Sequence, residues 1–165
     1  MNIRKLILLL SLFIVLCVNA QPVVYKKAAH DLTPFTGTWT ASKGDMKYEI
    51  TFEKGTLDLE IDVNYTIEVV LASTKWFKGG KMIREVKING LNSILQGLVA
   101  EKDPLYLSIA YSDKEYESNF SGDFIIDSVK PLKAKLTIYP ALIITKGPRD
   151  TTYEFPTTLE FTKTK

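Results

Sequence analysis

The sequence predicts an all-β fold in which an antiparallel meander of about 8–10 strands closes into a barrel. Three observations predict it. Apolar and polar residues alternate with a period of two along most of the chain after residue 34. Turn residues interrupt the alternation about every ten residues, and no segment has a convincing amphipathic helical pattern. A β-sandwich fits the same pattern and is the alternative.

The alternation is clearest between residues 46 and 63. Apolar side chains occupy every second position over 46–52 and again over 57–63, with charged or hydroxyl residues at most positions between them. Because successive side chains of a strand point to opposite faces, each segment has one dry and one wet face. Lys54 and Gly55 separate the two segments and are predicted to form a turn. Such one-sided strands favour an antiparallel sheet over a buried parallel one.

The remaining elements follow the same rules. Gly79-Gly80 and Asn89-Gly90 are signals for tight turns between strands. Residues 91–100 fit either a strand or a short helix. Further strands are predicted over residues 65–77, 81–88, 105–111, 120–127, 134–145 and 153–161.

Residues 1–20 have the three parts of a secretory signal peptide. Arg4 and Lys5 give a positive start, an apolar run follows over 6–18, and small residues precede the bond after Ala20. The run is shorter than the roughly twenty apolar residues that a membrane span needs. We therefore predict cleavage near Ala20, a secreted or periplasmic protein, and no transmembrane segment after cleavage.

Cys17 offers a different N-terminal processing, which is lipid attachment. That processing requires a small residue before the cysteine, and Leu16 stands there. The predicted organisation is therefore a signal peptide over 1–20, an N-terminal arm over 21–34, and a single β-barrel-like domain over 35–165.

Signal cleavage changes the composition in two ways. It removes the only cysteine, so the mature chain has no disulfide and no thiolate site. It also removes two of the 21 basic residues, which leaves the rest in balance with the 19 acidic residues. Without a basic excess, we expect no nucleic-acid partner.

The chemistry of catalytic and metal sites is sparse. His30 is the only histidine, and it lies in the predicted arm, where we expect it to be a solvated bystander. With one histidine and no cysteine, the usual zinc and transition-metal ligand sets cannot form within one mature chain. We predict no enzyme activity, no cofactor, and no catalytic, cofactor-binding or metal-binding residue.

One stretch, LEIDVN at 59–64, resembles the E-I-D-x-E strand of laminarinase-type glycoside hydrolases. The resemblance implies two catalytic carboxylates, one a nucleophile and the other a general acid. Glu60 and Asp62 match the motif, but Asn64 stands where the second glutamate is needed. We expect Glu60 and Asp62 to belong to the wet face of a strand, and hydrolase activity is the distant alternative.

The stretch DLTPFTGTW at 31–39 resembles the opening of lipocalins, and avidin-type barrels also open on GTW. The resemblance implies a lipocalin-like (calycin-like) barrel in which Gly37 lets the first strand bend and Trp39 packs across the base. It also implies an arginine that stacks on the tryptophan, for which Arg149 is the nearest candidate. The T-D-Y motif and the final helix of lipocalins have no clear counterpart.

A resemblance also covers most of the chain. The order of signal peptide, GTW strand, KYEITFEKG, KWFKGGK and a closing YEFPTTLEFTK is similar to a family of small, secreted, uncharacterised proteins typical of Bacteroidota. This resemblance implies secretion and a β-fold and leaves the function open.

Two classes of function fit these observations. The first is a barrel that encloses a small lipophilic ligand, whose contact residues the sequence does not identify. The second is a structural or interaction domain of the cell envelope with a solid core and a working outer surface. In both classes Gly37 and Trp39 are expected to be structural, and the filling of the interior would separate the two classes.

Overall fold

A computed structural model describes residues 23–60, 64–88, 93–113, 118–140 and 155–164. These residues form strands, turns and bends, with no helix among them. The strands are β1 (Val24–Lys26), β2 (Gly37–Lys43), β3 (Met46–Glu60), β4 (Asn64–Lys78), β5 (Lys81–Val86), β6 (Ser93–Ala100), β7 (Asp103–Asp113), β8 (Ser118–Ile126), β9 (Lys133–Pro140) and β10 (Thr158–Lys163).

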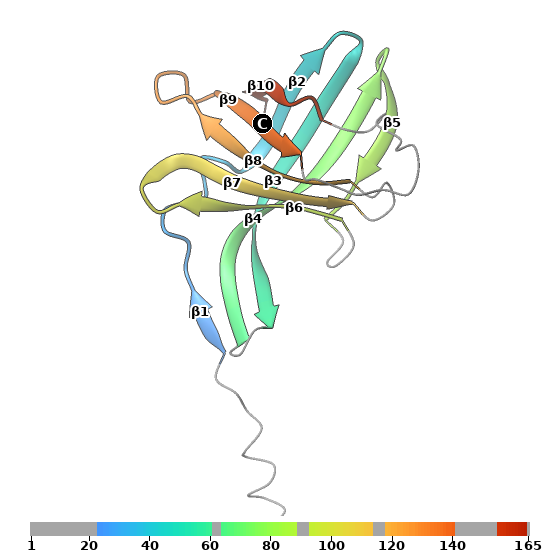
Figure 1. Ribbon diagram of the computed structural model, residues 1–165. Helices are drawn as coiled ribbons and strands as arrows, with labels where there is room; N and C mark the ends of the chain where they lie inside the picture. The colour runs from blue at the N-terminus through green and yellow to red at the C-terminus, as the bar shows by residue number, and fades with distance from the viewer. Residues whose placement is uncertain (1–22, 61–63, 89–92, 114–117, 141–154, 165) are drawn as a thin grey trace, which may run out of the picture.

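The strands form one sheet that closes on itself (Figure 1). The sheet order is β1-β4-β3-β2-β10-β9-β8-β7-β6, and residues 70–72 of β4 also pair with residues 95–97 of β6. That pairing joins β2, β3, β4, β6, β7, β8, β9 and β10 into an antiparallel barrel of eight strands. The predicted all-β barrel is confirmed, and the sandwich alternative is wrong because no break divides the eight strands into two sheets.

Strand β4 has three different partners along one edge. Its residues 65–67 pair with β1 in parallel, 70–72 pair with β6, and 74–78 pair with β5. The barrel wall therefore uses the middle of β4, while β1 and β5 extend the sheet beyond the two ends of that contact. The predicted turn at Gly79-Gly80 lies between β4 and β5, and residues 91–100 contribute the strand β6.

The predicted turn at Lys54 and Gly55 is wrong. Strand β3 runs without a break through both residues, and it pairs with β4 over its whole length. The apolar side chains of β3 nevertheless move from one face of the strand to the other at Lys54 and Gly55. The pairing of β4 with β6 stops at Val70, which lies opposite Lys54. The rest of the hairpin projects beyond the barrel, beside β1 (Figure 1). The shift in the apolar pattern therefore marks where the strand leaves the barrel.

Gly55 has a packing role at the point where the apolar face of β3 changes. A side-chain carbon at Gly55 would lie 2.6 Å from Cδ1 of Leu71 on the neighbouring strand. Leu71 therefore packs over the bare backbone, and a larger residue at position 55 would displace it.

The inner face of the barrel is filled by two groups of aromatic rings toward opposite ends. One group surrounds Phe124, whose ring centroid lies 5.1 Å from Trp39, 5.1 Å from Phe52 and 5.8 Å from Phe161. We call this the Phe124 cluster. It lies near the β8–β9 turn, where the arm enters β2. All four side chains are buried.

The other group surrounds Phe155, which precedes β10. Its ring centroid lies 5.1 Å from Trp76, 5.6 Å from Tyr48, 5.9 Å from Phe120 and 6.3 Å from Tyr111. We call this the Phe155 cluster. Edge and tilted contacts at these distances are the favourable geometries for aromatic pairs. The described interior is therefore packed with aromatic rings toward both ends of the barrel.

Candidate functional site

Gly37 and Trp39 lie where the arm enters the barrel. Gly37 has a φ of 107°, a conformation that glycine adopts readily and other residues rarely do. The indole of Trp39 is 0% exposed, and its Nε1–H donates to the carbonyl oxygen of Phe35 at 2.7 Å. The segment that bends at Gly37 thereby satisfies the one polar atom of the buried ring.

A cation from the last strand covers Trp39. Nζ of Lys163 lies 5.3 Å from the centroid of the indole and donates to the carbonyl oxygen of Pro34 at 2.9 Å. Burial lowers the pKa of Lys163. The lipocalin resemblance implied an arginine here, but Arg149 lies outside the described residues and Lys163 occupies this place. Leu159 and Phe161 are buried at alternate positions before it, a signal that could have identified Lys163 as inward-facing.

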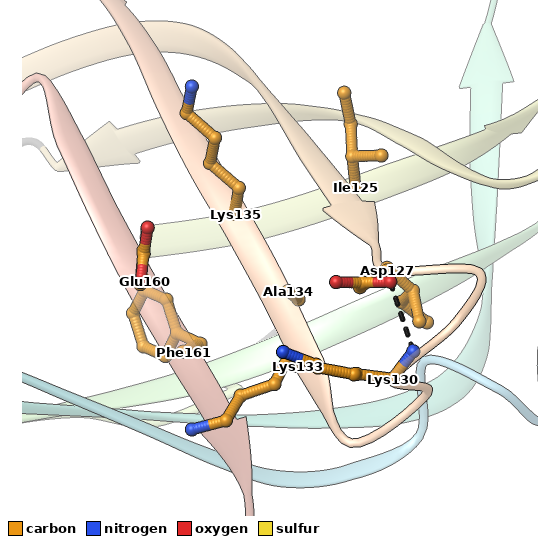
Figure 2. Close-up of a pocket in the computed structure, with 9 residues that line it drawn as sticks. Ile125, Asp127, Lys130, Lys133, Ala134, Lys135, Glu160 and Phe161 are labelled. Atoms are coloured by element: carbon orange, nitrogen blue, oxygen red, sulfur yellow. Dashed lines mark hydrogen bonds between the residues drawn. The ribbon is translucent and has the colours of Figure 1, made fainter.

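A hollow of about 520 Å³ lies near the β8–β9 turn. Its polar lining includes three lysines, Lys130, Lys133 and Lys135, and two acids, Asp127 and Glu160 (Figure 2). Ile125, Ile126, Ala134 and Phe161 provide the apolar lining. The hollow is open to solvent and combines ammonium groups with an apolar floor, which suits a ligand that has both an anionic and an apolar part.

Two tyrosines share one acid on the outer wall. Tyr106 of β7 and Tyr139 of β9 both donate to the carboxylate of Asp123 on β8, the latter at 2.6 Å. The hydrogen bond to Asp123 raises the pKa of Tyr106 to about 12. Both phenols therefore stay protonated at neutral pH and tie three strands together.

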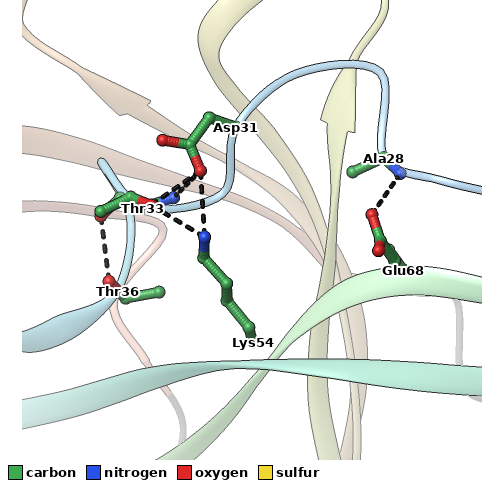
Figure 3. Close-up of polar contacts among 6 residues, drawn as sticks. All are labelled: Ala28, Asp31, Thr33, Thr36, Lys54 and Glu68. Atoms are coloured by element: carbon green, nitrogen blue, oxygen red, sulfur yellow. Dashed lines mark hydrogen bonds and ion pairs between the residues drawn. The ribbon is translucent and has the colours of Figure 1, made fainter.

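The arm is fastened to the hairpin by a second polar group. Oδ1 of Asp31 accepts from the hydroxyl of Thr33 at 2.7 Å, from its N–H at 3.0 Å and from Nζ of Lys54 at 3.0 Å (Figure 3). The Thr33 hydroxyl, the Thr33 N–H and the lysine together lower the pKa of Asp31 to about 2. A carboxylate with so low a pKa is a poor proton shuttle at neutral pH.

Glu68 holds the arm at a second point. It accepts from the hydroxyl of Tyr25 at 2.5 Å and from the N–H of Ala28 at 3.0 Å (Figure 3 shows the latter). The hydrogen bond from Tyr25 lowers the pKa of Glu68, and the same bond raises the pKa of Tyr25. The described part of the arm thus includes a strand, β1, whose position is fixed by side-chain contacts.

His30 faces a hollow of about 310 Å³ between the arm and the hairpin. Its Nε2 lies 3.0 Å from the carbonyl oxygen of Glu101 in the β6–β7 turn. The side chain is partly exposed and has a backbone partner, so it contributes to holding the arm. Asp31 and Glu68 border the same hollow, but their oxygens already accept the bonds described above.

Two residues of β4, Trp76 of the Phe155 cluster and Thr74 beside it, each carry a buried polar atom without a hydrogen-bond partner among the described residues. Trp76 is 0% exposed and Thr74 is 1% exposed, yet neither Nε1 of Trp76 nor Oγ1 of Thr74 has a partner within the described part of the chain. Thr74 and Trp76 are two positions apart on β4, so both side chains lie on its inner face. The guanidinium carbon of Arg84 lies 5.3 Å from the centroid of the Trp76 ring.

Several expectations concern residues at the margin of the structure. Asp62 lies outside the described residues, and Glu60 is described only as the last residue of β3. Among the described side chains, no group of three or more His, Cys, Asp or Glu residues is placed to hold a metal ion. No helix that could cross a membrane occurs in the described part of the chain.

Comparison with protein families gives one match. Residues 1–94 match the model of a family of unknown function, DUF6705, and this is more than half of the chain. The chain belongs to the DUF6705 family. The match spans the GTW opening and the β3–β4 hairpin, so these features lie within the DUF6705 region. No curated protein matches the chain, and no solved structure matches it.

Proposed function

We propose that this DUF6705 protein is an exported, non-catalytic β-barrel that acts through its outer surface. The observation that carries the proposal is the filling of the inner face by the Phe124 and Phe155 clusters, where ring centroids lie 4.7–6.3 Å apart. Contacts at these distances leave no room between the rings for a lipophilic ligand. Both hollows described above are open to solvent, one near the β8–β9 turn, where it reaches Phe161 at the edge of the Phe124 cluster, and one beside the arm.

The polar groups support a binding or structural role over a catalytic one. The Asp31 and Glu68 carboxylates act as acceptors that fasten the arm, and His30 faces a backbone carbonyl. A general acid or base works best with a pKa near the working pH, whereas the pKa values of both carboxylates are lowered.

Analysis of bound molecules tests the outer-surface proposal. Protein purified from its native source without detergent would be extracted with organic solvent, and the extract compared with one from the urea-unfolded and washed protein. We expect no lipophile in stoichiometric amount. A single lipophilic compound recovered at one per chain would overturn the proposal and favour the ligand-enclosing barrel.

Export is tested separately by the mass of the mature chain. The full sequence, produced in a bacterium with its own first twenty residues, should give a soluble product that begins at Gln21. A product that keeps Arg4 and Lys5, or one that carries lipid at Cys17, would contradict the proposed processing.

A small ligand at the Trp76 end is the second candidate function. The unpaired Nε1 of Trp76 and Oγ1 of Thr74 favour it, because buried polar atoms in native proteins nearly always have a partner. A ligand with a hydrogen-bond acceptor would satisfy both atoms. The same extraction experiment, carried out on wild type and on the Thr74→Val variant, tests this candidate. A compound that is recovered from wild type and is reduced or lost in the variant would support it.

A further inference from the structure

The β8–β9 turn presents apolar side chains to solvent. Val129 is 84% exposed, the highest value among the large apolar residues of the described chain, and Leu132 is 59% exposed. Both stand in the six-residue connection between Ile126 and Lys133. Exposure of two such residues at one tip has an energetic disadvantage in water that a partner surface would remove.

The turn is held in shape by its own hydrogen bonds. Oδ1 of Asp127 accepts from the N–H groups of Val129 at 2.8 Å and Lys130 at 3.0 Å. Two backbone bonds, Lys133 N–H to Lys130 O at 2.7 Å and Asp127 N–H to Lys133 O at 2.9 Å, close the turn. A turn already ordered loses little conformational entropy when it meets a partner.

Lysines flank the apolar tip. Lys130, Lys133 and Lys135 are exposed and border the hollow of about 520 Å³ behind the turn (Figure 2). None of these lysines takes part in the ion pairs found between described residues. Nζ of Lys133 donates to the hydroxyl of Thr162 at 2.7 Å, a neutral partner that leaves the charge of the lysine unpaired. All three ammonium groups can therefore attract anions.

We propose that the β8–β9 turn docks the protein on an anionic lipid membrane. Val129 and Leu132 enter the boundary between headgroups and acyl chains, and Lys130, Lys133 and Lys135 contact lipid phosphates. The combination follows the two-signal rule for peripheral binding, in which a weak apolar anchor acts together with basic residues. This inference rests on the proposed outer-surface function and names its partner.

Vesicle binding tests the inference. Purified mature protein would be sedimented with vesicles of phosphatidylcholine alone, and with vesicles of equal parts phosphatidylcholine and phosphatidylglycerol. We expect binding to the anionic vesicles to be about tenfold or more stronger, and to weaken as salt is raised, because each lysine near an anionic surface contributes about fivefold.

Paired variants locate the contact. Val129→Ser with Leu132→Ser, and Lys130→Gln with Lys133→Gln, should each weaken binding to anionic vesicles by about tenfold or more. The matched control is Lys78→Gln with Lys81→Gln, which makes the same charge change beside the β4–β5 turn. It should leave binding within about twofold of wild type. Urea unfolding of each variant confirms that the fold is kept.

Three outcomes would overturn the docking surface: equal binding to both kinds of vesicle, no binding to either, or a control pair as damaging as the lysine pair. Competition by millimolar inorganic phosphate at constant ionic strength would also overturn it, by assigning the lysines to a free anion. None of these outcomes affects the extraction experiment. Failure of the membrane inference and failure of the outer-surface function are therefore distinguishable.

Discussion

The two tryptophans of the barrel are equally buried, but only one of them has a hydrogen-bond partner for its indole N–H among the described residues. Trp39 and Trp76 are both 0% exposed, and each lies 5.3 Å from a cationic group, Lys163 in one case and Arg84 in the other. Nε1 of Trp39 donates to the carbonyl oxygen of Phe35, whereas Nε1 of Trp76 has no partner in the described ranges. Among the described residues, the indole N–H is therefore satisfied by the chain at one end of the barrel and unpaired at the other.

The origin of the difference lies in what covers each ring. At the Trp39 end, the arm supplies the carbonyl oxygens of Pro34 and Phe35, which pair with Lys163 and the indole. At the Trp76 end, the indole packs against the ring of Phe155 at a centroid distance of 5.1 Å, and Tyr48 is its cross-strand neighbour on β3. An unpaired N–H in such surroundings either destabilises the fold or is satisfied by water or a ligand.

The largest expected effect is that of removing the Trp39 ring. Trp39→Ala should lower the free energy of unfolding by about 3–5 kcal/mol, since a large buried side chain is lost and a cavity remains. Urea unfolding measures this loss. If the variant keeps the wild-type midpoint and a bound ligand is lost instead, Trp39 is a binding residue and its structural assignment fails.

Exchange of each tryptophan for phenylalanine isolates the hydrogen bond. Trp39→Phe leaves the Phe35 carbonyl oxygen without the indole donor, whereas Trp76→Phe removes an N–H that has no partner. Trp39→Phe should therefore be more destabilising than Trp76→Phe by about 1–3 kcal/mol in urea unfolding. Equal losses would mean that an unseen acceptor, such as buried water, satisfies Trp76.

Much of the barrel could be predicted because the signal is local. The alternation over 46–52 gives the inner face of β3, and the same period places Trp39 in the core. The predicted turn at Lys54 and Gly55 is wrong because a shift in the apolar pattern has two possible causes. The chain can turn, or the strand can continue while its environment changes, and the alternation alone does not distinguish them.

The polar contacts at the Trp39 end could not be predicted in the same way. Asp31 and Lys54 are 23 positions apart, and Lys163 contacts Pro34 across 129 positions. No local pattern specifies such partners, because they depend on how the barrel closes. The unpaired atoms of Thr74 and Trp76 are equally hidden, since strand periodicity predicts burial but not hydrogen bonding.

Removal of Oγ1 of Thr74, the second unpaired atom, tests the difference between the Trp39 and Trp76 ends of the barrel. Thr74→Val keeps the shape of the side chain and replaces a buried hydroxyl that has no partner. The variant should have a free energy of unfolding equal to wild type or higher by about 1 kcal/mol. A loss of more than about 1 kcal/mol in urea unfolding would show that the hydroxyl has a partner, either water or a ligand.

The smallest expected effect concerns the polar fastening at the Trp39 end. The pKa of Asp31 is lowered from 3.8 to about 2 by the Thr33 hydroxyl, the Thr33 N–H and Lys54. Because the folded-state pKa lies below the unfolded one, the ionised carboxylate stabilises the fold above about pH 4. This contribution disappears as the pH falls through about 2.

Asp31→Asn should therefore reduce the urea midpoint slightly at pH 5, and the difference from wild type should vanish by about pH 2. The shift should be small, because the group is exposed to solvent and screened. Lys54→Gln is the matched variant: it removes one donor and leaves Thr33 in place, so its pH-dependent effect should be smaller than that of Asp31→Asn. A difference between wild type and Asp31→Asn that stays constant from pH 5 to pH 2 would contradict the assignment of this acid to the arm contact.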